Sequence, residues 1–191
     1  MKEKIIYVIA GCNGAGKTTA SYTILPDILD CKIFVNADEI AKGLSPFDVE
    51  SVAFESGRIM LERIDNLISE NKSFSIETTL SSKSYKNIFA NAINKGYTIK
   101  LLFFWLHNES LAIKRVKTRV KEGGHNITEI VIKRRYQRGI DNLFKIYLPL
   151  LSEIMIFDNS NDTIELVATG NFGIQNITNY NKWKKIQKKV S

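Results

Sequence analysis

The segment Gly11-Cys12-Asn13-Gly14-Ala15-Gly16-Lys17-Thr18 sets the fold expected of this 191-residue chain. It matches the pattern G-x-x-x-x-G-K-[ST] at every fixed position, and it follows an apolar run, Ile5 to Ala10, that is typical of a buried strand. A glycine-rich turn between a strand and a helix points successive backbone N–H groups inward, where they bind phosphate oxygens. The segment therefore predicts a phosphate-binding loop at the end of the first strand.

Two side chains of this loop have predicted roles in binding ATP with Mg²⁺. Lys17 is expected to bridge the β- and γ-phosphates and to act in catalysis, and the Thr18 hydroxyl is expected to be a Mg²⁺ ligand. The residues predicted to bind the nucleotide are Gly11, Cys12, Asn13, Gly14, Ala15, Gly16, Lys17, Thr18 and Thr19.

Apolar runs alternate with helical patterns along the rest of the chain. This alternation is typical of a parallel sheet covered by helices on both faces. We therefore predict an α/β fold, a three-layer P-loop sandwich with a mainly parallel five-stranded sheet, in a single domain over residues 1–191. Residues 163–169 are a candidate edge strand. The five strands are expected at Ile5–Ala10, Ile33–Asn36, Ser73–Glu77, Thr98–Leu106 and Glu153–Phe157.

Cap and stop residues predict where the helices begin and end. Ser45-Pro46-Phe47-Asp48 resembles a helix start, with the helix continuing to about residue 71. Residues 84–94 form a second predicted helix, which Gly96 ends. Residues 109–121 and 128–147 form two more, separated by a glycine-containing hinge. Residues 170–191 are a basic C-terminal tail, either helical or frayed.

The formal charge of +7 is concentrated in two segments. Residues 107–147 carry ten Lys/Arg against four Asp/Glu, and residues 171–191 carry five Lys and no acid. Such clusters suit nucleic acid, but a helical lid that closes over a polyphosphate needs the same charges. The hinge favours the interpretation that the first segment, residues 107–147, is an arginine-bearing lid.

Polar residues that follow the predicted strands are candidates for the acceptor side of a transfer reaction, because ligands bind at the carboxyl ends of parallel strands. Asp38 and Glu77 are both placed there, and either carboxylate could accept a proton or hold Mg²⁺. Asp38 could instead cap a short helix, and Glu77 could be a satisfied strand end. Thr78 and Thr79 could contact a sugar or cap the turn.

Arginines on the two predicted lid helices are candidates for binding the migrating phosphoryl group. Arg115 and Arg119 are four residues apart, as are Arg134 and Arg138, so each pair shares a helix face. We predict that Arg119 and either Arg134 or Arg135 contact the γ-phosphate, since the guanidinium fork suits phosphate oxygens. A solvated basic helix is the alternative for each arginine.

The cysteines and the N-terminus bear on the cellular location. Cys12 and Cys31 have no framework spacing, and we expect both to be free thiols in a reducing compartment. The N-terminal residues have neither the length nor the flanks of a signal peptide or a membrane span. A cytoplasmic protein with no membrane association is therefore expected.

Four motifs in order resemble the zeta toxin family and its shorter relatives over residues 5 to about 143. They are Gly11 to Thr19, then Asn36-Ala37-Asp38, then Ile76-Glu77-Thr78-Thr79-Leu80, and finally residues 119–127 leading to Arg134-Arg135-Tyr136. The chain departs from the longer toxins after Asp38, where it lacks their arginine and His-Pro. It also lacks their larger C-terminal region.

The resemblance implies a kinase that uses ATP or GTP with Mg²⁺ to phosphorylate the sugar 3′-hydroxyl of UDP-N-acetylglucosamine. It implies Asp38 as the base, Glu77 and Thr79 at the acceptor, and Arg119 and Arg134 as γ-phosphate clamps. It also implies a small antitoxin protein as a partner. A nucleic-acid end kinase or binding protein, and a nucleotide-dependent regulatory ATPase, remain the alternatives to a small-molecule kinase.

Overall fold

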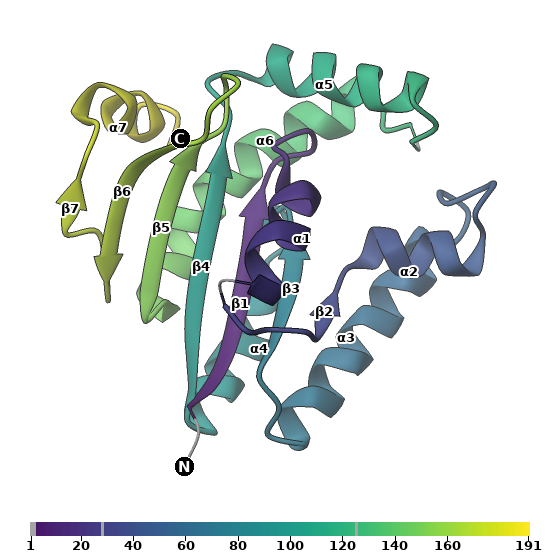
Figure 1. The fold of residues 1–191 in the computed structure, drawn as a ribbon, viewed down its shortest axis with the longest axis vertical. Helices are drawn as coiled ribbons and strands as arrows, with labels where there is room; N and C mark the ends of the chain where they lie inside the picture. Colours follow the sequence, from purple (N-terminus) through teal and green to yellow (C-terminus); the bar gives the residue numbers. More distant parts are fainter. Residues whose placement is uncertain (1–2, 28, 125) are drawn as a thin grey trace.

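A computed structural model describes residues 3–27, 29–124 and 126–191, and their strands form one sheet with helices on both faces (Figure 1). The strands are β1 (Lys4–Gly11), β2 (Phe34–Val35), β3 (Phe74–Thr78), β4 (Tyr97–Trp105), β5 (Glu153–Asp158), β6 (Glu165–Asn171) and β7 (Asn176–Ile177). Their order is β2-β3-β1-β4-β5-β6-β7. The strands from β1 to β5 pair in parallel, which confirms the mainly parallel α/β sandwich.

Helices cover the sheet as the alternating pattern predicts. Figure 1 shows α1 in front of the sheet and α4 and α6 behind it. A π-helical turn, Leu143–Tyr147, and a short 3₁₀ turn, Leu148–Leu150, continue α6. The helices are α1 (Lys17–Asp27), α2 (Ala37–Leu44), α3 (Ala53–Ser69), α4 (Tyr85–Asn94), α5 (Glu109–Lys121), α6 (Glu129–Asn142) and α7 (Tyr180–Gln187).

The centre of the sheet is made by β1, which lies between β3 and β4. Val8 pairs with Ile76 on one side and Leu101 on the other, and all three are fully buried. Each such side chain contributes about 1.5–3 kcal/mol of transfer free energy. Because these strands are parallel, the loop after β1 and the polar ends of β2 and β3 lie at one edge of the sheet.

The number of strands differs from the prediction, because seven strands, not five, are found in the described residues. The candidate edge strand is found as β6, which pairs with β5 antiparallel, but it is not at the edge, because β7 pairs with its other side. After β5 the chain turns back directly instead of crossing over through a helix, so β6 runs opposite to β5, and β7, antiparallel to β6, runs in the direction of β5 again. A strand as short as β7 has no hydrophobic period that the sequence could reveal.

The predicted helix start at Ser45 is wrong. The Ser45 N–H donates to the carbonyl of Ala41 and ends α2, whereas α3 begins only at Ala53. The polar residues between the helices form a turn, in which the Asp48 carboxylate accepts the N–H of Ser51 at 3.3 Å. Residues that suit a helix cap also suit such turns, so the pattern was ambiguous.

The C-terminal tail is packed against the domain. Trp183 and Ile186 of α7 are buried, and the Trp183 ring lies 5.7 Å from that of Phe144. Trp183 therefore contributes to the core and is not an exposed platform for stacking bases. Across residues 3–27, 29–124 and 126–191, no helix combines the length and apolarity that crossing a membrane requires.

Candidate active site

The predicted phosphate loop follows β1 and opens α1, as its sequence requires. Gly11 has φ 145°, and a Cβ there would lie 2.3 Å from the carbonyl oxygen of Phe104, so only glycine fits. Gly14 and Gly16 also have positive φ. The Lys17 ammonium donates to the carbonyl of Cys12 at 3.0 Å, across the mouth of the loop. The loop is thus shaped to receive phosphate oxygens.

Glu77, at the end of β3, contacts both functional side chains of the loop. The Thr18 hydroxyl donates to its two carboxylate oxygens at 3.1 and 3.0 Å, and Lys17 Nζ lies 3.8 Å from Oε1. Burial raises the pKa of Glu77, while the Lys17 charge and the Thr18 hydrogen bond act in the opposite direction. Glu77 therefore lies on the phosphate side of the site as well as beside the predicted acceptor.

The oxygen atoms of Thr18 and Glu77 suit Mg²⁺. Among the described residues, no group of three or more His, Cys, Asp or Glu side chains could hold a metal without other ligands. Mg²⁺ in phosphoryl-transfer sites, however, is held by one or two protein oxygens, by waters and by the substrate phosphates. A hydroxyl and a carboxylate in contact at the phosphate loop match that donor set.

The raised pKa of Glu77 predicts a pH dependence. As pH rises through the pKa of Glu77, ionisation of this carboxylate lowers the stability of the ligand-free protein. As pH falls, protonation removes the charge that attracts Mg²⁺. We expect the Kd for ATP with Mg²⁺ to rise as pH is lowered from about 7 to about 5. The pH profile of the Glu77→Gln variant reports only the protonation of ATP itself. This variant should therefore lack the part of the increase in Kd that comes from Glu77. Parallel profiles for the two proteins would contradict the assignment.

A cavity of about 140 Å³ joins the phosphate loop to the ends of β2 and β3. It brings Lys17, Asp38, Glu77 and Thr79 together from three separate stretches of the chain. Arg119 and Arg134 do not line it. Its lining is Asn13, Lys17, Asn36, Ala37, Asp38, Met60, Glu77, Thr78, Thr79, Tyr85 and Arg135.

Asn36, and not Asp38, caps the helix after β2. The Asn36 Oδ1 atom accepts the N–H of Asp38 at 2.8 Å, so the alternative that Asp38 serves as the cap is wrong. Within the described part of the chain, the buried Asn36 Nδ2 has no hydrogen-bond partner. Sequence reasoning assigned Asn36 no role, although its position two residues before Asp38 is the usual spacing of such a cap.

A second cavity, of about 500 Å³, extends from Asp38 between the start of α3 and the α5–α6 connection. Asp38 and Arg135 line both cavities, whereas the exposed Arg134 lines only the second. Arg119 packs beside Gly124, since a Cβ added to Gly124 would lie 2.8 Å from the Arg119 Cγ. The predicted contact of Arg119 with phosphate stays a prediction. Closure of α5 and α6 as a lid also stays a prediction, and His125 of the hinge lies outside the described residues.

Arg135 is the α6 arginine that reaches the phosphate loop. Its Nη1 atom lies 3.4 Å from Oδ1 of Asn13, close to the limit for a hydrogen bond. Burial lowers the pKa of Arg135, and the nearby Asp38 charge offsets part of that effect. Of the two residues that the sequence left open, Arg135 is therefore the one placed between the loop and Asp38.

The placement of Arg135 predicts a difference between neighbouring arginines. We expect Arg135→Gln to lower kcat by about 100-fold, as loss of one donor to the developing charge does. Arg138→Gln, an exposed change on the same helix, should leave kcat unchanged. Steady-state kinetics of both variants, with Arg134→Gln beside them, would measure this. Equal losses for Arg135 and Arg138 would contradict the assignment.

The phosphate loop is also held by Asn159, which sequence reasoning missed, and by Arg115, which it had proposed only as a candidate phosphate ligand. Asn159, just after β5, donates from Nδ2 to the carbonyl of Ala15 at 2.8 Å. The Arg115 guanidinium donates to the carbonyls of Asn159, at 2.7 Å, and Ser160, at 3.4 Å. No local pattern marks these contacts, because they join segments more than 40 residues apart in the chain.

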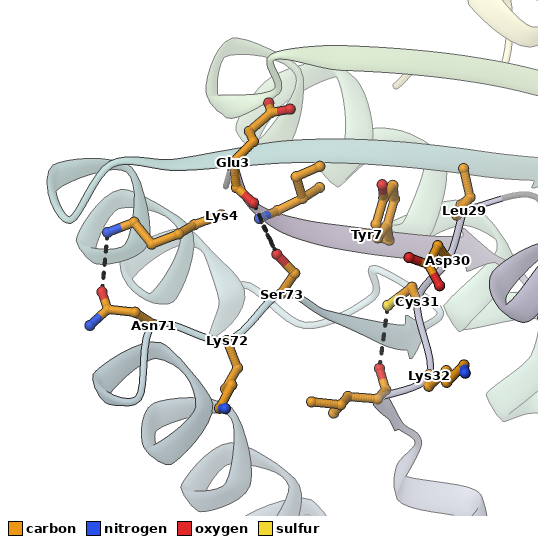
Figure 2. Close-up of a pocket in the computed structure, with 12 residues that line it drawn as sticks. Glu3, Lys4, Tyr7, Leu29, Asp30, Cys31, Lys32, Asn71, Lys72 and Ser73 are labelled. Atoms are coloured by element: carbon orange, nitrogen blue, oxygen red, sulfur yellow. Dashed lines mark hydrogen bonds between the residues drawn. The ribbon is translucent and has the colours of Figure 1, made fainter. Parts of the chain in front are cut away.

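A hollow of about 490 Å³ lies at the opposite end of the sheet and contains none of the predicted site residues (Figure 2). It is lined there by Tyr7 and by Cys31, whose thiol donates to the carbonyl of Ile33 at 3.6 Å. Cys12 and Cys31 are both free, as expected, and both are buried. Burial raises the pKa of the Cys12 thiol to about 11, which leaves it unreactive near neutral pH.

Comparison with known proteins agrees with this geometry. The family model described as "Zeta toxin" matches residues 1–166. An uncharacterized protein of Haemophilus influenzae is 29% identical over 136 residues, covering 71% of this chain and 94% of that protein.

Two solved structures share the fold at 18% identity. The AvrRxo1-ORF1:AvrRxo1-ORF2 complex with sulphate ions has a TM-score of 0.79, with 96% of this chain and 63% of that chain covered, and the complex was also solved with ATP. The PezAT toxin-antitoxin system of Streptococcus pneumoniae has a TM-score of 0.70, with 100% and 79% covered. The chain thus spans under two thirds of the first of these proteins.

Proposed function

The chain belongs to the zeta toxin family, and from this premise we propose that it transfers the γ-phosphoryl group of ATP to a hydroxyl group of a small-molecule acceptor. The observation that carries the proposal is the cavity in which Lys17 and Arg135 lie with Asp38. Cations for the migrating group and a carboxylate for the attacking hydroxyl are what a kinase needs in one place.

The described residues divide the reaction between them. The loop N–H groups and Lys17 bind the β- and γ-phosphates, and Arg135 stabilises negative charge on the transferred group. Asp38 accepts the proton of the acceptor hydroxyl while the hydroxyl oxygen forms a bond to the γ-phosphorus. At the same time the bond between the γ-phosphorus and the bridging oxygen breaks, and ADP leaves. When bound by Thr18 and Glu77, Mg²⁺ would neutralise charge on the phosphates.

We further propose that the acceptor occupies the cavity of about 500 Å³. This volume suits a nucleotide-sized molecule, and Arg134 and Arg135 can bind its anionic groups. The family resemblance makes UDP-N-acetylglucosamine the first acceptor to test, with transfer to its sugar 3′-hydroxyl.

The test is an assay with γ-labelled ATP and Mg²⁺ over a panel of UDP-sugars, comparing the wild-type protein with Asp38→Asn. Labelled UDP-N-acetylglucosamine that is absent with the variant would support the reaction and its base. Steady ATP hydrolysis with no labelled acceptor in any reaction would overturn the proposed UDP-sugar acceptor and would favour a regulatory ATPase.

We also propose that an antitoxin protein is a partner of this chain. Support comes from two neighbours of the same fold, both of which are described as parts of two-component assemblies. Titration with a protein encoded next to this chain should block ATP binding if that protein is the antitoxin. Unchanged ATP affinity at saturating amounts would reject that candidate.

A further inference from the structure

The C-terminal helix α7 lies beyond residues 1–166, which the family model matches, yet an ion pair between the half-buried Lys182 and the buried Asp158 connects it to the end of β5. Lys182 Nζ lies 2.7 Å from Asp158 Oδ2 and 2.6 Å from Glu165 Oε2. Asp158 is only 3% exposed. Figure 1 shows α7 at the same end of the sheet as the loop that follows β1.

The other oxygen of Asp158 orders the turn that follows β5. Asp158 Oδ1 accepts the N–H of Ser160 at 2.9 Å and also the Ser160 hydroxyl. The Ser160 hydroxyl in turn accepts the N–H of His107 at 2.8 Å. Burial raises the pKa of Asp158, but the hydrogen bonds from Lys182 and Ser160 outweigh this and keep the pKa below its usual value. The carboxylate is therefore charged and fully engaged.

This ordered turn supports the phosphate loop from outside. Asn159 donates to the carbonyl of Ala15, and a Cβ at Gly16 would lie 2.5 Å from Asn159 Nδ2. Arg115, which donates to the carbonyls of the turn, has its Cβ 3.2 Å from the position of a Cβ on Gly14. A displacement of the turn would therefore move two glycines of the loop.

We infer that Lys182 is a positioning residue for nucleotide binding, which acts by neutralising Asp158 and so keeping the turn at residues 158–160 against the phosphate loop. The inference rests on the proposed binding of ATP and extends it to a helix outside the matched region. A buried carboxylate that loses its cation must recruit water or take up a proton, and either change weakens its hold on Ser160.

The test is the Kd for ATP with Mg²⁺, measured by calorimetry without acceptor on the full chain. Lys182→Met should raise the Kd about tenfold, as loss of a supporting residue outside a site commonly does. Lys184→Met and Lys185→Met remove exposed charges from the same helix and should leave the Kd unchanged. Lys182→Arg, which keeps the cation, should restore most of the affinity.

A double variant separates positioning from stability. Asp158→Asn with Lys182→Met removes both charges and keeps an oxygen that accepts from Ser160, so its Kd should lie within about threefold of wild type. Should Lys182→Met not fold, Ser160→Ala, which also loosens the turn, should raise the Kd in its place. Folded Lys182→Met and Ser160→Ala proteins with wild-type Kd would overturn the inference. A wild-type protein that binds no ATP would instead overturn the proposed function.

Discussion

Lys17→Met is expected to reduce phosphoryl transfer by about 10³-fold and to weaken ATP binding. Lys17 is buried beside Glu77 and spans the loop to the carbonyl of Cys12, so its ammonium is held where the β- and γ-phosphates would bind. Among the residues that the structure describes, no other lysine lines this cavity. Loss of a fixed charge that stabilises the transition state costs about 2.7–4 kcal/mol, and loss of ground-state binding adds to that.

The control for Lys17 is Lys72→Met, an exposed lysine at the opposite end of the sheet. Initial rates and calorimetric titrations with ATP would be measured for both variants, after thermal melting shows that each is folded. Removing Lys17 leaves Glu77 with the Thr18 hydrogen bonds, and a carboxyl whose pKa is already raised can protonate. Transfer at wild-type rate by a folded Lys17→Met protein would show that the phosphate-loop assignment is wrong.

Asp38→Asn is expected to lower kcat by about 10²–10⁴-fold while the Kd for ATP changes little. Asp38 lines both the cavity at the loop and the larger cavity proposed for the acceptor, which is where a base for the acceptor hydroxyl has to be. The helix cap is supplied by Asn36, so the substitution should also leave the stability of α2 nearly unchanged.

Glu39→Gln is the matched control, because this neighbouring acid lines neither cavity and pairs with Lys42 at 2.7 Å near the surface. Its kcat should equal that of wild type. Single-turnover measurements with saturating ATP would isolate the chemical step from product release. An Asp38→Asn protein with an unchanged single-turnover rate would assign the base to another group, and Glu77 would be the next carboxylate to replace.

Much of the fold could be predicted because its determinants are local. The run from Ile5 to Ala10 is apolar throughout, since a central parallel strand is buried on both faces. Gly96 ends α4 with φ 78°, a conformation that glycine adopts at little cost. The helix start at Ser45 was misassigned because cap and turn residues are chemically the same.

In the candidate site, too, the residues with local determinants could be predicted and the others could not. Loop residues with their own pattern, together with Asp38 and Glu77 at strand ends, could be named from the sequence because their places follow from parallel topology. The choice between Arg134 and Arg135 could not, since adjacent residues on a helix point about 100° apart and only packing decides which one faces inward.

The sequence by itself determined the phosphate loop, the parallel sheet and the family to which the chain belongs. Only the tertiary structure decided that Arg135 faces the loop and that Lys182 reaches Asp158. The physical reason is distance along the chain: these contacts join residues brought together by burial of the whole core. No short-range period or spacing encodes them.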